Sequence, residues 1–263
     1  MGELISTETH TEYNTMKKIF IALFASIITL TAAAGNDNIG KEKNWSVRLS
    51  AGYNIGGTAP LLMPVEIRGI EGFNPGLNFS FEESVQFLFG KGHWGLRFGA
   101  RVESKGMTTN ADTKNYQMEV ANGDGIVSGR WTGKVETNVK NIYFTTPILA
   151  VYQINKRWNV SAGVYTSFLL KGEFTGYAYD GYLREGNPTG EKIELEKAAY
   201  DFSSDIRKFQ FGLQAGGEYQ ICNHLAIFAD IKWGLNSIFP RDYNCVTFAL
   251  YPIYGTLGLT CNF

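Results

Sequence analysis

The side chains best able to do chemistry in this chain are charged residues that recur at every second position of β-like segments. An enzyme would need such groups to converge on a nucleophile or base, but the sequence contains no G-x-S-x-G, H-E-x-x-H or paired-cysteine signature. His10 lies in a polar leader, while His93 and His224 lie in or beside short turns. We therefore expect no enzyme, no catalytic residue, no metal site and no cofactor.

Charges of both signs on one strand face fit a different chemistry. If that face lines a narrow closed sheet, carboxylates and cations would neutralise one another as buried ion pairs. Left unpaired, they would demand water and leave a narrow leak. We predict a lumen plugged by a charge network whose members are Arg48, Glu82, Arg97, Arg101, Glu103, Glu218, Asp230 and Lys232.

The elements that carry these charges alternate apolar and polar residues. Trp158, Val160, Ala162 and Val164 share one face, whereas Asn159 and its alternate neighbours share the other. A period of two predicts a β-strand, and a long apolar face backed by small polar residues is typical of a membrane-spanning barrel. Eight such segments are predicted, at residues 44–54, 76–89, 94–104, 137–154, 158–171, 209–221, 225–235 and 246–263.

The connections between these segments alternate strictly in length. Residues 90–93, 155–157 and 222–223 form short polar turns, and residues 55–75, 105–136, 172–208 and 236–245 form long connections. Even-stranded outer-membrane barrels have short periplasmic turns and long extracellular loops. The predicted fold is therefore all-β, an eight-stranded antiparallel up-and-down transmembrane β-barrel. A soluble lipocalin-type barrel is disfavoured because the polar face carries Gly, Ser, Asn and Gln rather than many charges.

Aromatic residues fall at the two ends of the predicted strands. Trp45, Trp94 and Trp158 each open a strand at the periplasmic side, and Trp233 lies toward the opposite rim. Such belts are typical of a membrane interface. Three residues fit the strands poorly, and we expect β-bulges near each of them. They are Glu83 on the apolar face beside Glu82, and Pro147 and Pro252 within strands.

The N-terminal part predicts export. Residues 1–15 are polar and unpatterned, which indicates an upstream extension that is not native. Residues 16–34 combine a basic start, an apolar core and Ala32-Ala33-Ala34, the features of a signal peptide. Residues 35–43 would form a short periplasmic segment, and residues 44–263 the barrel domain in the cell outer membrane. In an exported protein Cys222 and Cys261 could form a disulfide, although small apolar side chains are the better interpretation of the cysteines.

The net charge of −1 offers no basic field for nucleic acid. We expect a monomer whose partners are outer-membrane lipid and lipopolysaccharide, with a protein or glycan ligand at the loops. Aromatic residues of the long connections are candidate contact residues, unless they pack the loops on one another. These are Trp131, Phe174, Tyr177, Tyr179 and Tyr182.

Three segments resemble a known family. They are residues 103–106 (ESKG), residues 139–149 (VKNIYFTTPIL) and residues 200–213 (YDFSSDIRKFQFGL). Together with terminal Phe263 they resemble the PorT-like outer-membrane β-barrel proteins of the Bacteroidetes. The resemblance implies an eight-stranded barrel similar in build to OmpA and OmpX. It also implies insertion by a barrel-assembly machinery that reads a C-terminal strand ending in an aromatic residue, here Phe263.

Two roles follow for such a scaffold. The first is a structural or interaction role through the long extracellular loops, with the lumen filled by side chains. The alternative is a narrow porin-like channel for ions or small solutes. Some members of the resembling family serve protein secretion, so a secretion component is a minor third possibility.

Overall fold

The computed structural model describes residues 44–90, 92–122, 125–240 and 248–263. The predictions for residues 1–15, 16–34 and 35–43, and the position of Cys245, lie outside these residues. The described part is β-structure apart from one short 3₁₀ helix, η1 (Ser203–Asp205). None of its helices is long and apolar enough to cross a membrane.

Eleven strands form one antiparallel sheet among the described residues. Eight of them follow predicted strands, and the bounds of β6 agree with the alternating segment at both ends. The strands are β1 (Trp45–Ala59), β2 (Ile67–Asn74), β3 (Phe79–Leu88), β4 (Trp94–Asn122), β5 (Gly125–Gln153), β6 (Trp158–Lys171), β7 (Phe174–Glu185), β8 (Lys192–Asp201), β9 (Phe209–Gln220), β10 (Leu225–Gly234) and β11 (Tyr251–Asn262).

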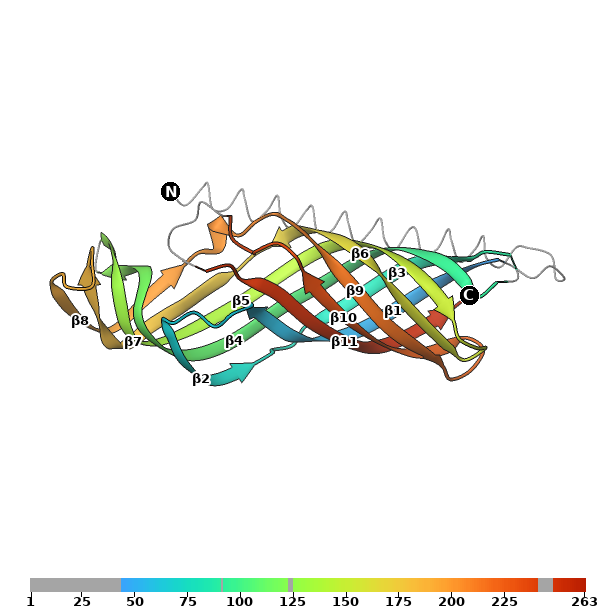
Figure 1. The fold of residues 1–263 in the computed structure, drawn as a ribbon, viewed down its shortest axis with the longest axis horizontal. Helices are drawn as coiled ribbons and strands as arrows, with labels where there is room; N and C mark the ends of the chain where they lie inside the picture. The colour runs from blue at the N-terminus through green and yellow to red at the C-terminus, as the bar shows by residue number, and fades with distance from the viewer. Residues whose placement is uncertain (1–43, 91, 123–124, 241–247) are drawn as a thin grey trace, which may run out of the picture.

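The pairing of the strands closes on itself. Neighbours run in the order β4-β3-β1-β11-β10-β9-β6-β5, and β5 pairs back with β4. β2 attaches to the outer part of β4, while β7 pairs with β5 and β8 with β7. The strands wind obliquely around a common axis, with β2, β7 and β8 at one end (Figure 1). We call β2, β7, β8 and residues 108–122 and 125–138 the extension, and the opposite end the turn end.

The sheet thus has more strands than the eight predicted, because the predicted loops contain strands. β1 continues to Ala59 and β2 follows, so residues 55–75 are not a simple loop. Residues 105–136 continue β4 and β5, which pair almost to their tips. Residues 172–208 contain the β7–β8 hairpin. Pairing satisfies the backbone N–H and C=O groups of these long segments. Backbone hydrogen bonds form whatever the side chains are, so these strands lack the apolar alternation that would have predicted them.

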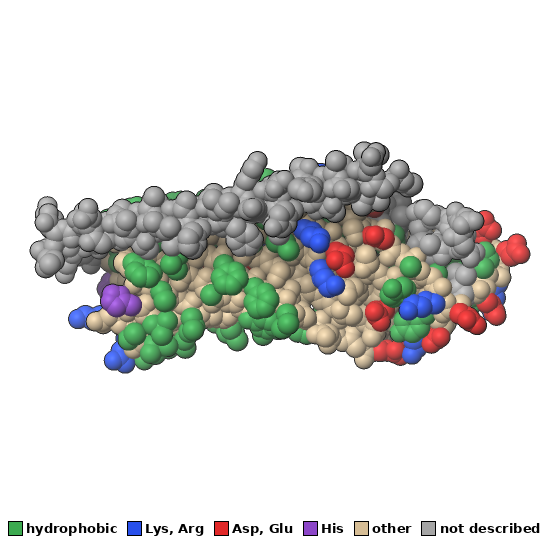
Figure 2. Space-filling model, turned by 180° about the vertical axis from the view of Figure 1, so that it is seen from behind, with side chains coloured by type: hydrophobic (Ala, Val, Ile, Leu, Met, Phe, Trp, Pro, Cys, Tyr) green, Lys and Arg blue, Asp and Glu red, His purple; other side chains and the backbone are tan. Residues whose placement is uncertain are grey.

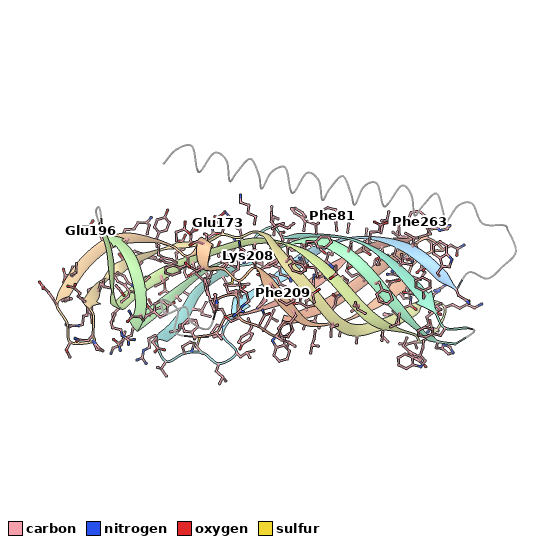
Figure 3. The ribbon with its side chains drawn as sticks, turned by 90° about the horizontal axis from the view of Figure 1, so that it is seen from above. Phe81, Glu173, Glu196, Lys208, Phe209 and Phe263 are labelled. Carbon is pink, nitrogen blue, oxygen red and sulfur yellow. The ribbon has the colours of Figure 1, made fainter. Side chains whose placement is uncertain are left out.

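The molecule is polarised along its long axis. Hydrophobic side chains gather over the half that ends in the histidine-bearing turns, and acidic and basic side chains gather on the other half (Figure 2). Phe263 lies near the turn end and Glu196 at the far end of the extension (Figure 3). His93 and His224 are exposed in the turns, where each ring contacts a backbone carbonyl. The short and long connections therefore lie at opposite ends.

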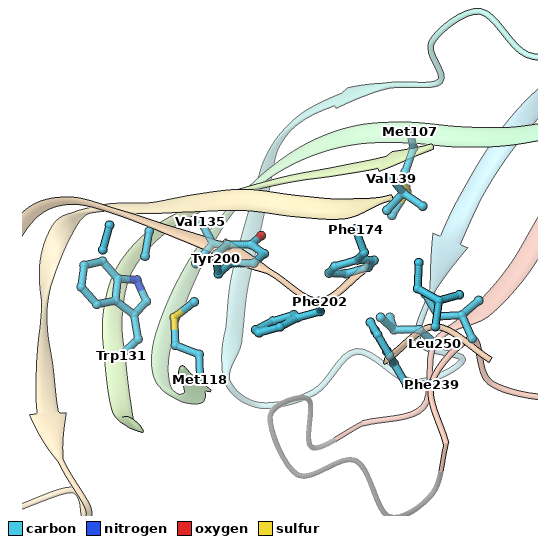
Figure 4. Close-up of a cluster of buried hydrophobic side chains, with 14 of the residues drawn as sticks. Met107, Met118, Trp131, Val135, Val139, Phe174, Tyr200, Phe202, Phe239 and Leu250 are labelled. Carbon is cyan, nitrogen blue, oxygen red and sulfur yellow. The ribbon is translucent and has the colours of Figure 1, made fainter. Parts of the chain in front are cut away.

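A hydrophobic core lies in the extension and continues into the adjoining residues of the barrel rim, such as Met107, Val139 and Phe239. Trp131 and Phe174, predicted as contact or packing residues, are buried in it together with Met118 and Tyr200 (Figure 4). Tyr177 is exposed, and Tyr179 and Tyr182 are half-buried. The structure thus divides the predicted aromatic set into two packing residues and three surface tyrosines.

The predicted β-bulges are wrong. β3 pairs with β1 and β4 without a register shift, and Glu83 lies opposite Leu49 and Ala100 on the outer face. Pro147 pairs with Tyr165 in regular register, so its missing N–H is tolerated without an extra residue. Pro252 lies opposite Thr58 of β1. On its other side the β10–β11 ladder ends at the pair of Trp233 and Ile253, so the ladder does not need an N–H donor from Pro252.

The disulfide that the sequence left open between Cys222 and Cys261 is not formed. Cys222 and Cys261 are both free and exposed at the turn end.

Candidate functional site: a charged lumen inside an apolar wall

The strand period of two builds the site by sending alternate residues inward and outward. In β6, Ser161 and Ser167 point inward and are buried, whereas Trp158 and Val164 on the outer face are 48% and 50% exposed. Large hydrophobic residues that are more than two-fifths exposed recur on every strand of the ring. The molecule is therefore inverted relative to a soluble barrel, with polar groups inside and apolar groups outside.

The predicted charge network lies in this interior. Its members come from five strands, β1, β3, β4, β9 and β10, and the N-terminal three meet the other two only when the ring closes. Glu82 and Asp230 are half-buried, and the other six, Arg48, Arg97, Arg101, Glu103, Glu218 and Lys232, are buried.

Glu103 is the centre of the network. Its carboxylate lies 2.5 Å from Lys232 Nζ, 3.1 Å from Lys105 Nζ and 3.6 Å from Arg101 Nη1. It also accepts a hydrogen bond from Thr145 Oγ1 at 2.9 Å. One carboxylate therefore offsets three buried cations, so no other side chain in the lumen carries as much of the charge balance.

Two further groups complete the network. Toward the turn end Glu218 forms a bidentate pair with Arg48, and Arg97 Nη2 lies 3.8 Å from the same carboxylate. In the middle Arg101 Nη2 lies 2.5 Å from Glu82 Oε2. The charges are thus arranged in layers along the axis rather than around one reacting centre.

Asp230 contacts the network through an uncharged side chain. Gln214 Nε2 donates to Asp230 Oδ2 at 3.0 Å, and Gln214 Oε1 accepts from Arg101 Nη2 at 2.9 Å. In the same way Asn54 Oδ1 accepts from Lys232 Nζ and from Thr256 Oγ1. The amides connect the charged layers into one hydrogen-bonded filling.

Sequence reasoning missed Lys105, because the predicted strand ended at residue 104. The period of two could have identified it, because Lys105 follows Glu103 by two positions and therefore lies on the same strand face. Its ammonium lies 5.2 Å from the ring centroid of Tyr143 and 4.9 Å from that of Tyr165. These rings offer cation–π contacts to a charge that has little access to water.

The filled interior leaves little space. The cavity among the charged layers has a volume of about 20 Å³ and is lined by Arg48, Arg97, Glu82 and their neighbours. A volume of that size holds about one water molecule. Over the described part of the chain, no group of three or more His, Cys, Asp and Glu residues is placed to hold a metal ion. What the arrangement can do chemically is neutralise charge and close the lumen.

The pattern of a polar interior and an apolar exterior agrees with the sequence family. Residues 33–240 match the family described as outer membrane protein beta-barrel domain. The chain belongs to this family. It is accordingly an outer-membrane protein, and its ring of strands is a β-barrel.

Solved structures include similar barrels at low identity. Ail, the attachment invasion locus protein of Yersinia pestis, solved with the heparin analogue sucrose octasulfate, is 11% identical; the match covers 84% of this chain and 100% of that chain, with a TM-score of 0.39. Neisserial surface protein A is 10% identical; the match covers 84% and 98%, with a TM-score of 0.31. A comparison with curated protein sequences finds no significant match.

Aromatic pairs mark the two rims of the barrel wall. At the turn end the ring centroids of Trp94 and Tyr152 lie 4.8 Å apart, and those of Trp158 and Tyr219 lie 4.9 Å apart. Trp45 pairs with Phe87 across β1 and β3 at the same end. Trp233 lies at the other rim, 42% exposed. Aromatic rings at both rims suit the two interfaces of a bilayer.

The height of the wall fits a membrane. From Trp158 to Phe168 the strand advances ten residues (168 − 158), and Phe168 contacts Phe209 at the second rim, with ring centroids 5.2 Å apart. At roughly 3.3 Å per residue and a tilt of roughly 40°, this segment spans roughly 25 Å along the barrel axis. That distance equals the usual apolar band of an outer-membrane barrel.

Phe263 lies at the turn end and closes the wall. Its N–H donates to the carbonyl of Val47, and its own carbonyl accepts from the Val47 N–H. The C-terminal residue is therefore hydrogen-bonded to the first strand of the barrel.

Proposed function

We propose that this protein is an eight-stranded transmembrane barrel with a sealed lumen, which presents a folded extension to a partner outside the cell. The eight strands are those of the closed ring, β1, β3, β4, β5, β6, β9, β10 and β11. The short turns would face the periplasm, as in other bacterial barrels. The observation that carries the proposal is that the long connections form paired strands on a buried core rather than loose loops.

A rigid extension is suited to binding because its conformational entropy is lost when the protein folds. Binding of a partner then costs little further entropy. Its β7–β8 hairpin carries tyrosines paired with cations. Lys197 Nζ lies 3.8 Å from the ring centroid of Tyr177, and Lys192 Nζ lies 4.6 Å from that of Tyr182. Tyrosine and arginine are enriched among residues that dominate binding energy, and Arg184 also lies over Tyr182.

Deletion of residues 176–198 tests the proposal. We expect the truncated protein to reach the outer membrane and keep its heat-modifiable mobility on gels, because the ring pairs without β7 and β8. Affinity purification from native outer membranes should then lose the partner that the full chain retains. Failure of the truncated barrel to insert would contradict a separable extension.

A surface variant refines the same experiment. Tyr177→Ser with Tyr182→Ser should reduce partner recovery about tenfold or more while leaving the hairpin folded, because neither ring is buried in the core. Lys140→Ser is the matched control, since its ion pair with Glu173 is exposed at the rim. Partners purified with the control also show whether barrel-assembly machinery or a secretion complex accompanies the protein.

The channel alternative has a direct test in single-channel recording across planar bilayers. We expect no discrete conductance steps, because the charged layers leave a cavity of only about 20 Å³. Reproducible steps from the wild-type protein would overturn the sealed lumen and support a narrow porin-like pathway. A matched recording with Arg48→Ala and Glu218→Ala, which removes the bidentate pair nearest the turn end and leaves only Arg97 there, should show steps if that pair contributes to the seal.

A further inference from the structure

A second cavity lies above the charged layers, where the barrel meets the extension. Its volume is about 290 Å³, and residues of β1, β2, β4, β5, β7, β8 and β11 line it. The core side chains Met107, Met118, Val135, Phe174 and Tyr200 form part of its wall (Figure 4). An apolar cavity of about 150 Å³ is enough to stay dry and bind benzene, so this cavity is large enough for a bigger hydrocarbon group.

The polar groups of the lining are already satisfied by the protein. Tyr200 OH donates to the carbonyl of Glu136 and lies 2.7 Å from Thr137 Oγ1. Thr109 Oγ1 and Thr113 Oγ1 donate to backbone carbonyls at 3.1 and 2.9 Å. Burial raises the pKa of Tyr200, so its hydroxyl stays neutral. The cavity therefore offers a ligand apolar contacts rather than charge or strong hydrogen bonds.

The cavity opens sideways between two strands that do not pair with each other. Within the described residues, β1 pairs with β3 only from Trp45 to Tyr53. On its other side it pairs with β11 from Arg48 to Ala59, so the last residues of β1 have a strand on one side only. β2 pairs with β4 alone, and its Phe73 ring lies beside Gly57 of β1, where an added Cβ would come within 3.2 Å of the ring. The backbone N–H of Thr58 accordingly contacts Met107 Sδ at 3.3 Å instead of a strand. Met63, Ile70, Phe73 and Ile253 line the cavity and are also exposed, so we take the surface that they share as its mouth.

Beside the mouth runs an apolar segment between β1 and β2. Leu61, Leu62, Met63 and Val65 are 52%, 86%, 56% and 77% exposed. Exposed apolar residues this close together mark a surface that meets apolar partners or lipid. The segment extends the apolar surface of the wall to the mouth, which would let a hydrocarbon group pass from one to the other without crossing water.

We propose that this cavity is a binding site for an uncharged hydrocarbon group that enters sideways between β1 and β2. The lining favours such a ligand, because flexible methionines adapt to irregular apolar shapes and the aromatic rings add large apolar surfaces. The group can be a compact free molecule or the end of a lipid acyl chain. This site lies apart from the charge network and from the surface tyrosines of β7 and β8.

Naphthalene fluorescence tests the site in the full chain, purified in a sterol-based detergent whose rigid tail differs from an acyl chain. We expect saturable binding of one naphthalene per chain. Ala111→Phe, which fills the cavity, should weaken that binding at least tenfold. Ala150→Phe is the matched control, because Ala150 lies on the exposed outer wall of β5 and its replacement should leave binding unchanged.

A second variant keeps the test decisive if Ala111→Phe does not fold. Ile70→Asp places a charge at the mouth, on a side chain that is 55% exposed, and should also weaken binding at least tenfold. Equal binding by the wild type and by the folded variants would overturn the proposal. Competition with dodecanoate separates the two sources: displacement of naphthalene assigns the site to acyl chains, and naphthalene binding without displacement assigns it to compact hydrocarbons.

Discussion

Replacing Glu103 with glutamine is expected to lower the free energy of unfolding by about 3–5 kcal/mol, the usual cost of removing one partner from a buried ion pair. The amide keeps the shape of the side chain but leaves Lys232, Lys105 and Arg101 without their shared carboxylate. Urea unfolding of the protein in detergent micelles, followed by tryptophan fluorescence, measures the change.

The control for this variant is Glu71→Gln. Glu71 pairs with Lys134 in the extension, where the side chains are 43% and 38% exposed. Water screens an exposed pair, so the expected change is small. Equal losses from the two variants would show that the lumen charges are far better solvated than their burial indicates.

A double variant separates charge from packing. Adding Lys232→Met to Glu103→Gln removes one of the stranded cations and replaces it with an apolar side chain of similar length. Part of the lost stability should return, because the penalty arises from uncompensated charge rather than from a cavity. No recovery would indicate that the hydrogen bonds of Glu103, including the one from Thr145, matter more than its charge.

Replacing Trp131 with alanine is expected to open the extension while the barrel stays folded. Trp131 is fully buried, and its ring lies against the backbone of Gly133 and Gly181, where an added Cβ would come within 3 Å of the indole. Truncating a buried tryptophan costs about 3–5 kcal/mol, which is comparable with the stability of a small hydrophobic core.

Hydrogen exchange resolves this effect strand by strand. Amides of the β7–β8 ladder should lose protection, whereas those of the β10–β11 ladder should keep it. Trp158→Ala serves as control, because that side chain is half-exposed on the outer wall and does not contribute to the core of the extension. A uniform loss of protection along the chain would mean that the barrel and the extension unfold as one unit.

The strands of the wall could be predicted because two requirements act on alternate residues. In β6 the outer face must be apolar over the height of the membrane, and the inner face must be small or polar, so the period of two extends over the whole strand. The same alternation predicted the charged interior, with Arg48 and Glu218 inward on strands that are 170 positions apart in sequence.

Beyond the rim neither face has to meet lipid or fill the lumen. The alternation therefore stops there, and the strands of the extension could not be predicted from it. Residues 108–114 of β4 are mostly small and polar, yet they form a strand because β2 and β5 supply their hydrogen-bond partners. Trp131 shows the same limit. Its burial depends on the β7–β8 hairpin that covers it. The residues around Trp131 in the sequence do not indicate a contact with a hairpin that lies more than 40 positions further along the chain.

The sequence by itself determined the kind of wall, the positions of the turns and the sign of the lumen charges, since each follows from residue types at fixed spacing along one strand. Only the tertiary structure decided that Glu103 serves three cations, that the long connections pair into an extension, and that a cavity opens between β1 and β2. These features depend on which strands become neighbours when the ring closes, and strand pairing brings together residues whose distance along the chain carries no information about their contact.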